Sequence, residues 1–208
     1  MDLLVGTQNP GKMREYRALL ASLPARVLFP ADLGLAVEVT ESGRTYAENA
    51  CIKARVYARA IGQGHGGIAP LLVLADDSGL EVDGLDGAPG VRSARYVLGS
   101  DTDRLATLLA HLEGVPSERR TARFRCVIAI VAPQDELYTA EGTCEGVIAT
   151  APAGDGGFGY DPVFYLPEFG CTMAELPAQV KNRISHRARA VQAALPILRR
   201  LLAGDGWC

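Results

Sequence analysis

Two adjacent aspartates, Asp76 and Asp77, are the residues of this sequence best suited to chemistry. They follow the apolar run 71–75, whose length predicts a buried strand, and Gly79 would let the backbone turn away where that strand ends. Ligands of open α/β sheets bind beyond the carboxyl ends of strands. Neighbouring carboxylates repel each other, and a cation or a shared proton relieves that repulsion. The stretch therefore predicts a Mg²⁺ site, because Mg²⁺ takes oxygen ligands, with an ordinary turn as the alternative explanation.

A second candidate for ligand binding is the turn between a short apolar strand at 3–6 and a helix expected over 12–21. In this geometry, backbone N–H groups and the positive end of the helix dipole face an anion. The turn matches the P-loop pattern G-x-x-x-x-G-K, but Met13 stands where that pattern requires Ser or Thr. A different phosphate cradle, with a lysine as point charge, fits better; a plain turn with a solvated lysine is the alternative. The residues concerned are Thr7, Gln8, Asn9, Pro10, Gly11 and Lys12.

A third unusual stretch is the glycine-rich segment 154–161, which contains Phe158 and Tyr160. Glycines allow a backbone to approach a ligand closely, and exposed aromatic rings are costly unless they stack on a partner. A purine ring is one such partner. The alternative explanation is that the aromatic rings pack against the protein core and hold the loop in place. Further along, Ser185 suits the N-cap of a helix that extends to about residue 202. The donors of a Ser-His-Arg sequence at a helix start would suit keto oxygens or phosphates.

Capping residues and apolar spacing predict the elements that would position these groups. The capping box Thr45-x-x-Glu48 begins a helix to about residue 61, whose apolar stripe leaves Lys53 facing elsewhere. A second cap begins a helix over 100–113, and the loop 62–67 is expected to expose His65. Besides the run 71–75, strands are expected at 27–29, 35–40, 80–86, 121–132 and 137–150, the last two forming a hairpin around the turn 133–136.

The composition is that of an ordinary globular protein of 208 residues, enough for one large domain or two lobes sharing a sheet. A net charge of −3 argues against a general nucleic-acid binder, and no secretory signal or membrane span is expected. Five scattered cysteines without C-x-x-C spacing predict reduced thiols in a cytoplasmic protein. Arginine outnumbers lysine by 18 to three, and two of the lysines, Lys12 and Lys181, fall in the motifs that could bind ligands.

Six motifs, taken in order, resemble those of the inosine/xanthosine triphosphate pyrophosphatase family. The resemblance extends from Leu3 to about Leu202, which is nearly the whole chain. Each motif alone is moderately specific, and six in the same order are highly specific. They lie at 7–12, 45–50, 75–80, 87–96, 156–162 and 185–187.

The resemblance implies an α/β fold with a long mixed central β-sheet flanked by helices. Residues 1–208 would form a single domain of two lobes without a separate linker, with the active-site cleft between the lobes. The protein would be a homodimer, with no nucleic acid or membrane as partner. It would hydrolyse ITP, dITP and XTP to the monophosphate and pyrophosphate with Mg²⁺, and so cleanse the nucleotide pool.

The resemblance also implies a role for each motif. The turn 7–12 would cradle the triphosphate, Asp77 would be general base and metal ligand, and Ser78 would contact the substrate. The family commonly has a second metal-binding Glu at the position of Thr40, so here Glu41 would take that role, with Glu38 or Asp76 as alternatives. The base and sugar would be held by Phe158, Gly159, Tyr160 and Asp161, and the base would be read by Lys181, His186 and Arg187.

Two other function classes compete with this one. A P-loop ATPase or kinase is suggested by Gly6 to Lys12, although Met13 argues against it. A nucleotide-binding protein without catalysis would use the same residues but would not depend on the Asp77 carboxylate for its function.

Overall fold

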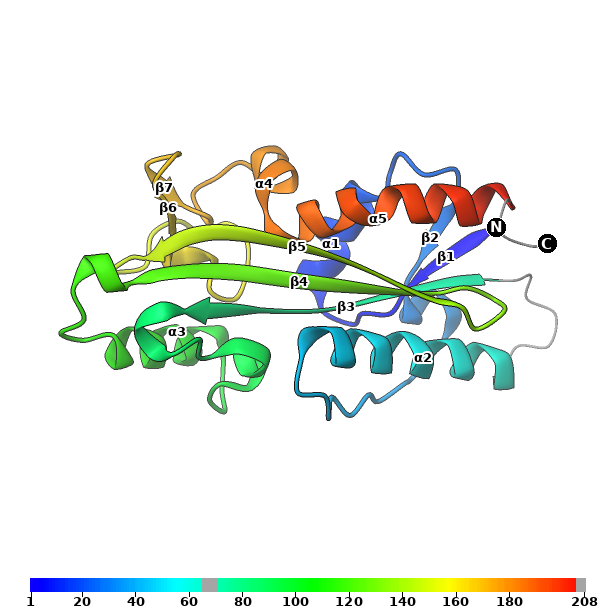
Figure 1. Ribbon diagram of the computed structural model, residues 1–208, viewed down its shortest axis with the longest axis horizontal. Helices are drawn as coiled ribbons and strands as arrows, with labels where there is room; N and C mark the ends of the chain where they lie inside the picture. The colour runs from blue at the N-terminus through cyan, green and yellow to red at the C-terminus, as the bar shows by residue number, and fades with distance from the viewer. Residues whose placement is uncertain (65–70, 205–208) are drawn as a thin grey trace. The chain divides into compact units, whose positions relative to one another are not determined.

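The computed structural model describes residues 1–64 and 71–204, and it is built on a seven-stranded mixed sheet of order β2-β1-β3-β4-β5-β6-β7 (Figure 1). Strand β1 pairs in parallel with β2 and β3, whereas β6 pairs in antiparallel fashion with β5 and β7. The expected mixed sheet is therefore confirmed. The strands are β1 (Asp2–Val5), β2 (Arg26–Leu28), β3 (Leu71–Val82), β4 (Thr121–Val131), β5 (Leu137–Ile148), β6 (Phe164–Leu166) and β7 (Cys171–Thr172).

Helices flank this sheet. The α-helices are α1 (Pro10–Leu19), α2 (Tyr46–Gly64), α3 (Asp101–His111), α4 (Ala178–Ile184) and α5 (His186–Ala203). Short 3-10 helices lie at Pro30–Leu33, Asp83–Leu85, Gly90–Arg95, Ser117–Arg119 and Asp161–Val163. The expected loop 62–67 is replaced at its start by the end of α2, and the prediction for His65 lies outside the described residues.

The chain divides into two compact units, and strands β3, β4 and β5 contribute residues to both. The first unit comprises Met1–Asp77, Cys126–Gly142 and Arg189–Cys208. The second comprises Ser78–Arg125 and Thr143–Ala188. The single domain expected over 1–208 stays a prediction.

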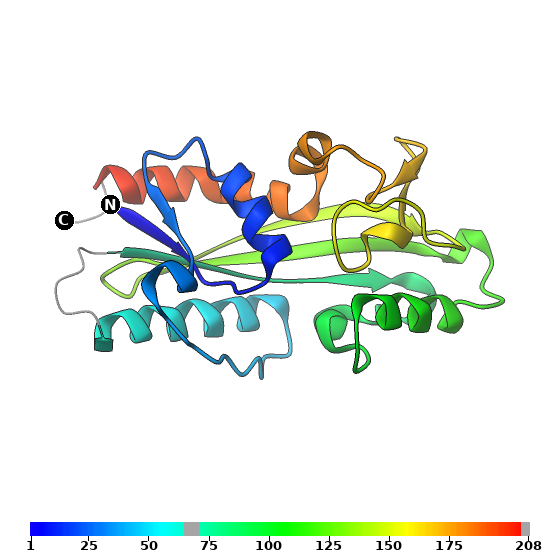
Figure 2. The same ribbon diagram turned by 180° about the vertical axis from the view of Figure 1, so that it is seen from behind.

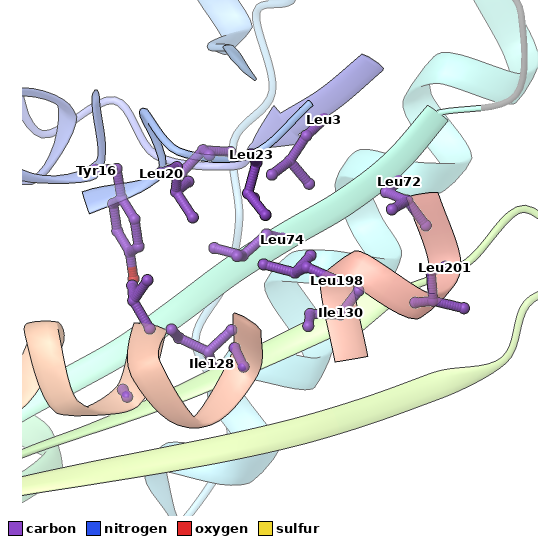
Figure 3. Close-up of a cluster of buried hydrophobic side chains, with 14 of the residues drawn as sticks. Leu3, Tyr16, Leu20, Leu23, Leu72, Leu74, Ile128, Ile130, Leu198 and Leu201 are labelled. Carbon is purple, nitrogen blue, oxygen red and sulfur yellow. The ribbon is translucent and has the colours of Figure 1, made fainter. Parts of the chain in front are cut away.

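The core of the first unit lies between the sheet and the helices α1 and α5 (Figure 3). Alternate residues of β1, β3 and β4 point into it, including Leu3, Leu74 and Ile130. Helix α2 covers the other side of the sheet in this unit (Figures 1 and 2). Because both faces are covered, β1 and the first half of β3 are buried almost throughout, which explains their continuous apolar sequence.

The second unit has its own core, in which α3 packs with the outer half of the sheet. Leu80 and Val82 of β3 meet Leu108 of α3 and the ring of Phe124 from β4 there. The predicted N-cap of α3 is confirmed, because Ser100 Oγ accepts a hydrogen bond from Asp103 N and the Asp103 side chain accepts one from Ser100 N.

Three predictions about elements are wrong. Strand β3 does not end at the two aspartates but continues to Val82, because Leu80 and Val82 supply apolar side chains to the second core. Residues 35–40 form no strand; this segment instead accepts a hydrogen bond at Val37 O from Gln8 Nε2. On α2, the spacing places Ala47 in the apolar stripe and Lys53 outside it, but Ala47 is exposed and Lys53 is buried, because the face that packs inward is partly polar.

Candidate active site

In the first unit, the turn 7–12 is held together by its own side chains. Strand β1 ends at Val5, and α1 begins at Pro10 with Asn9 as its N-cap. The Asn9 side chain accepts a hydrogen bond from Lys12 N at 3.0 Å, and Thr7 Oγ1 accepts one from Asn9 N at 3.3 Å. Thr7 and Gly11 are buried, whereas Gln8, Asn9 and Pro10 are exposed. An exposed turn at the start of a helix is the arrangement that suits an anion.

Lys12 reaches across to the first aspartate of β3. Its Nζ lies 2.8 Å from Asp76 Oδ2, and the Asp76 side chain is almost completely buried. The thiol of Cys126 also approaches that oxygen, with 3.7 Å between sulfur and oxygen. Strand β1 ends before the level of Asp76, because Val5 pairs with Leu74. The two aspartates therefore lie beyond the carboxyl end of β1, although not at the end of their own strand.

The second aspartate, Asp77, is held by two side chains of α2. Lys53 Nζ lies 3.0 Å from Asp77 Oδ1, and Asn49 Nδ2 donates to Asp77 Oδ2 at 3.1 Å. The same Lys53 Nζ lies 2.6 Å from Glu41 Oε1. Two carboxylates that were expected to bind a metal thus converge on one ammonium group.

Burial and neighbouring charges shift the pKa values of Asp77 and Lys53. Burial raises the pKa of Asp77, although the positive charges of Lys53 and Lys12 oppose that shift. Burial alone would lower the pKa of Lys53, but the carboxylates of Asp77, Asp76 and Glu41 outweigh it, so the pKa of Lys53 is raised. Lys53 therefore stays charged, and Asp77 is a carboxylate that binds a proton more readily than an exposed one.

In the second unit, the carboxylate of Asp161 organises the glycine-rich segment. Asp161 Oδ2 accepts hydrogen bonds from Phe158 N at 2.7 Å and from Lys181 Nζ at 2.5 Å, and both Asp161 and Lys181 are buried. Gly157 has φ +73, and a Cβ there would lie 2.1 Å from Asp161 Oδ2. Glycine is therefore required at this position both by the backbone conformation and by the close carboxylate.

Two cations lie over the ring of Phe158. Lys181 Nζ is 5.0 Å and Arg187 Cζ 5.5 Å from the ring centroid. Arg187 also donates to Ser78 Oγ at 3.1 Å, so Ser78 joins the same group. These distances are within the range of cation–π contacts, which hold the ring in place beside donors that could pair with a ligand.

The remaining predicted residues of this unit make mainly internal contacts. His186 stacks on the ring of Phe124, with 4.6 Å between centroids. Tyr160 donates to Ser93 O at 2.9 Å, and burial raises the pKa of its phenol. Gly159 N donates to Asp101 Oδ2 at 3.0 Å. Ser185 is confirmed as a helix cap, because its Oγ accepts a hydrogen bond from Ala188 N.

The model of the Ham1 family matches residues 3–197 of this sequence. The chain belongs to the Ham1 family. The resemblance inferred from the six motifs is therefore confirmed.

Several Ham1 relatives match over almost their whole length. A protein of Desulforamulus reducens, named dITP/XTP pyrophosphatase, is 50% identical over 203 residues, which are 97% of each chain. A protein of the same name from Geobacillus kaustophilus is 46% identical over 207 residues, 99% of this chain and 98% of that one. The solved structure of a HAM1 protein from Coxiella burnetii has 38% identity and a TM-score of 0.82, and the match covers 95% of this chain and 98% of that one. The α/β architecture is thus that of Ham1 structures.

Two residues of this Ham1 chain contact Asp77 but were not selected from the sequence. Lys53 was expected to face away from the apolar stripe of its helix, and Asn49 was only quoted within a motif. A signal for Lys53 was present, because it is one of just three lysines in a chain that otherwise uses arginine. Asn49 lies one helical turn before Lys53, which places both side chains on one face of α2.

The side-chain atoms that could bind a metal ion at this Ham1 site are carboxylate oxygens. Within residues 1–64 and 71–204, no group of three or more His, Cys, Asp or Glu side chains is arranged to hold a metal ion. The pair Glu41 and Asp77 is nevertheless suited to Mg²⁺, which is commonly bound by one or two carboxylates with water and substrate phosphates completing its shell. In the same part of the chain, none of the helices has the length and apolar character that a membrane crossing needs.

Proposed function

We propose that this protein hydrolyses deaminated purine nucleoside triphosphates, ITP, dITP and XTP, to the monophosphate and pyrophosphate. The observation that carries the proposal is the match, over 97% or more of the chain, to relatives named dITP/XTP pyrophosphatase. The buried carboxylates of the first unit and the cation-covered aromatic ring of the second unit supply groups suited to this reaction.

We propose Mg²⁺ as the cofactor, held by Asp77 and Glu41. The shared contact of both carboxylates with Lys53 Nζ supports this pair. The alternatives are Asp76, whose carboxylate lies 2.8 Å from a different ammonium group, that of Lys12, and Glu38, which is exposed. When bound, the ion would withdraw charge from the phosphates and stabilise the negative charge that develops on their oxygens.

Side chains of the protein carry out the proton transfer and bind the phosphates. Asp77 is the general base: it accepts a proton from water as the anhydride bond between the α- and β-phosphates breaks. Lys12 and the positive end of the α1 helix dipole bind the negatively charged phosphates. The raised pKa of Asp77 suits a base, because a carboxylate of ordinary pKa accepts a proton less readily.

The base would be read in the second unit. Phe158 stacks on the purine, and Lys181, His186 and Arg187 offer donors to the 6-keto oxygen. Adenine carries an amino group at that position, so a buried donor would face another donor and ATP would be rejected. Ser78, Gly159, Tyr160 and Asp161 hold the base and sugar directly or through the contacts described above.

Product analysis over a panel of nucleotides tests the proposal. Purified protein is incubated with ITP, dITP, XTP, ATP and GTP, with and without Mg²⁺, and released pyrophosphate and orthophosphate are measured separately. We expect rapid pyrophosphate release from the three deaminated nucleotides, dependent on Mg²⁺, and much slower release from ATP and GTP. Equal turnover of ATP would overturn the assignment of the base-reading residues.

The same experiment separates the two alternatives. A P-loop enzyme would release orthophosphate without added pyrophosphatase, and Met13 and the side-chain cap at Asn9 do not support such a loop. A nucleotide-binding protein would retain its function in Asp77→Asn, whereas the proposed enzyme would lose turnover by orders of magnitude.

We also propose a homodimer located in the cytoplasm, without nucleic acid or membrane as partner. The free thiols of Cys51, Cys126, Cys144 and Cys171 support a reducing compartment. The dimer follows from family resemblance, and sedimentation of the purified protein at micromolar concentration tests it.

A further inference from the structure

Helix α2 presents a polar side chain at every fourth position of its buried face. Asn49, Lys53 and Tyr57 are all buried and lie on one side of the helix. Lys53 contacts Asp77 and Glu41, and the Tyr57 ring packs against Gly6 at the start of the turn 7–12, where a Cβ would lie 2.4 Å from it. Every one of these three side chains therefore touches a segment that carries proposed site residues.

The hydrogen bonds of the Asn49 side chain fix the orientation of its amide. Its Oδ1 accepts a hydrogen bond from Gly43 N at 2.8 Å, so its Nδ2 must face the other way, where it donates to Asp77 Oδ2 at 3.1 Å. The side chain has no exposed surface. A Cβ on Gly43 would lie 2.6 Å from Asn49 Oδ1, so the backbone at 43 approaches the amide as closely as glycine allows. One amide thus joins the segment that carries Glu41 to the strand that carries Asp77.

Because the Asn49 side chain is uncharged, its hydrogen bond to Asp77 can have a role that the Lys53 ion pair cannot have. Lys53 neutralises Asp77, so its ammonium competes with any divalent ion for the same carboxylate. An amide donor orients the carboxylate without adding positive charge. An oxygen that accepts one hydrogen bond still has a lone pair for a metal or a water. Groups that hold metal ligands in this way commonly affect both metal affinity and rate.

We propose that Asn49 is a positioning residue. It orients Asp77 through its hydrogen bond to Oδ2, and through its hydrogen bond to Gly43 N it holds the segment of Glu41 beside Asp77. This inference rests on the proposed function, in which Asp77 is base and metal ligand and Glu41 is the second ligand. Asn49 itself touches neither substrate nor metal in this proposal.

Two substitutions distinguish positioning from a purely structural hydrogen bond. Asn49→Ala removes both contacts. Asn49→Asp keeps an acceptor for Gly43 N but cannot donate to Asp77, because an ionised carboxylate has no proton to give. Glu48→Ala is the matched control: Glu48 neighbours Asn49 and accepts from Arg44 N at 2.6 Å, but it is exposed.

The measurements are kcat and KM for ITP, and the affinity for Mn²⁺ alone, by calorimetry without nucleotide. For Asn49→Ala we expect kcat and Mn²⁺ affinity each to fall about 10- to 100-fold, with KM for ITP little changed. Asn49→Asp should lose kcat to a similar degree, and its buried carboxylate, which repels Asp77, should also lower the thermal stability. Glu48→Ala should match the wild type in both kcat and Mn²⁺ affinity.

The inference is overturned if Asn49→Ala keeps the kcat and Mn²⁺ affinity of the control and loses only stability. If Asn49→Ala does not fold, Asn49→Asp decides: a folded variant with wild-type kcat overturns the inference. Wild-type protein that hydrolyses none of the panel would refute the proposed function alone, since Mn²⁺ binding by the variants still decides the role of Asn49. Wild-type protein that also fails to bind Mn²⁺ would refute both.

Discussion

At the scale of single residues, the environment of Asp77 determines what the site can do. The carboxylate is buried, is paired with Lys53, and receives a neutral hydrogen bond from Asn49. Burial outweighs these favourable contacts and raises the pKa of Asp77. A group whose pKa is higher in the folded state than in the unfolded state contributes stability at low pH and loses it as pH rises through the folded pKa. Burial of the ionised Asp77 therefore costs stability at neutral pH, whereas the raised pKa of its partner Lys53 contributes stability there.

The variant Asp77→Asn tests this conflict between stability and activity. We expect turnover of ITP to fall by orders of magnitude, because the amide cannot accept the proton from water. We expect the melting temperature at pH 7 to be no lower than that of the wild type, with the difference shrinking as the pH falls. Differential scanning calorimetry at several pH values measures this, and a clear loss of stability at pH 7 would contradict the prediction.

At the scale of elements, the segment around Phe158 depends on Gly157. The variant Gly157→Ala combines a positive φ, which costs about 1–2 kcal/mol for an L-residue, with a contact between Cβ and the Asp161 carboxylate. Displacement of Asp161 would loosen both Phe158 and Lys181, so we expect KM for ITP to rise as well as stability to fall. Enzyme kinetics and chemical denaturation measure the two effects.

The matched control for this variant is Gly170→Ala. Gly170 has φ +66, but a Cβ there meets no atom within 4 Å. It should therefore lose stability to a similar extent from the backbone alone and keep the KM of the wild type. Equal KM values for the two variants would show that the contacts of Asp161 do not affect substrate binding.

Arg120 connects three elements of the second unit without a carboxylate among the partners described. It is buried and donates to the carbonyls of Leu112 at the end of α3, at 2.9 Å, and of Ala149 after β5, at 3.1 Å. We expect Arg120→Met to destabilise the protein by about 2–3 kcal/mol, because hydrogen bonds from a charged donor are lost and the part-buried carbonyl of Ala149 loses the partner described for it. The exposed neighbour Arg119 provides the control Arg119→Met, and urea denaturation of both compares them.

The elements also show where prediction from sequence ends. Capping residues correctly placed the starts of α3 and α5, because a cap is a local contact within a few residues. The continuation of β3 through Asp76 and Asp77 could not be read locally, since it depends on a second core at Leu80 and Val82. On α2, Lys53 was misjudged and Asn49 was not selected for a similar reason: helical spacing identifies a face, but only the partner strand shows that the buried face is polar.

At the scale of the whole molecule, the proposed functions fall on different units. The residues proposed to bind the triphosphate, including Lys12 and Asp77, belong to the first unit, and those proposed to read the base belong to the second. Substitutions in these two sets of residues should therefore affect the choice between nucleotides differently.

Comparing turnover of ITP and ATP across variants tests this division. Lys12→Met should lower kcat/KM for both nucleotides by a similar factor, because every nucleoside triphosphate carries the same phosphates. Arg187→Met should lower kcat/KM for ITP more than for ATP, because the lost donor pairs only with a keto oxygen. A Lys12 variant that changed the ratio of ITP to ATP turnover, or an Arg187 variant that left it unchanged, would contradict the division.

The discontinuous make-up of the first unit has a consequence for synthesis on the ribosome. Its core includes Val191, Ala194 and Leu198 of α5, a helix that is made after the rest of this core and long after Asp77. All segments of the second unit have been translated by Ala188. A nascent chain that stalls before α5 would therefore carry Asp77, the proposed general base, in an unfinished core, so we expect no activity until α5 has been made.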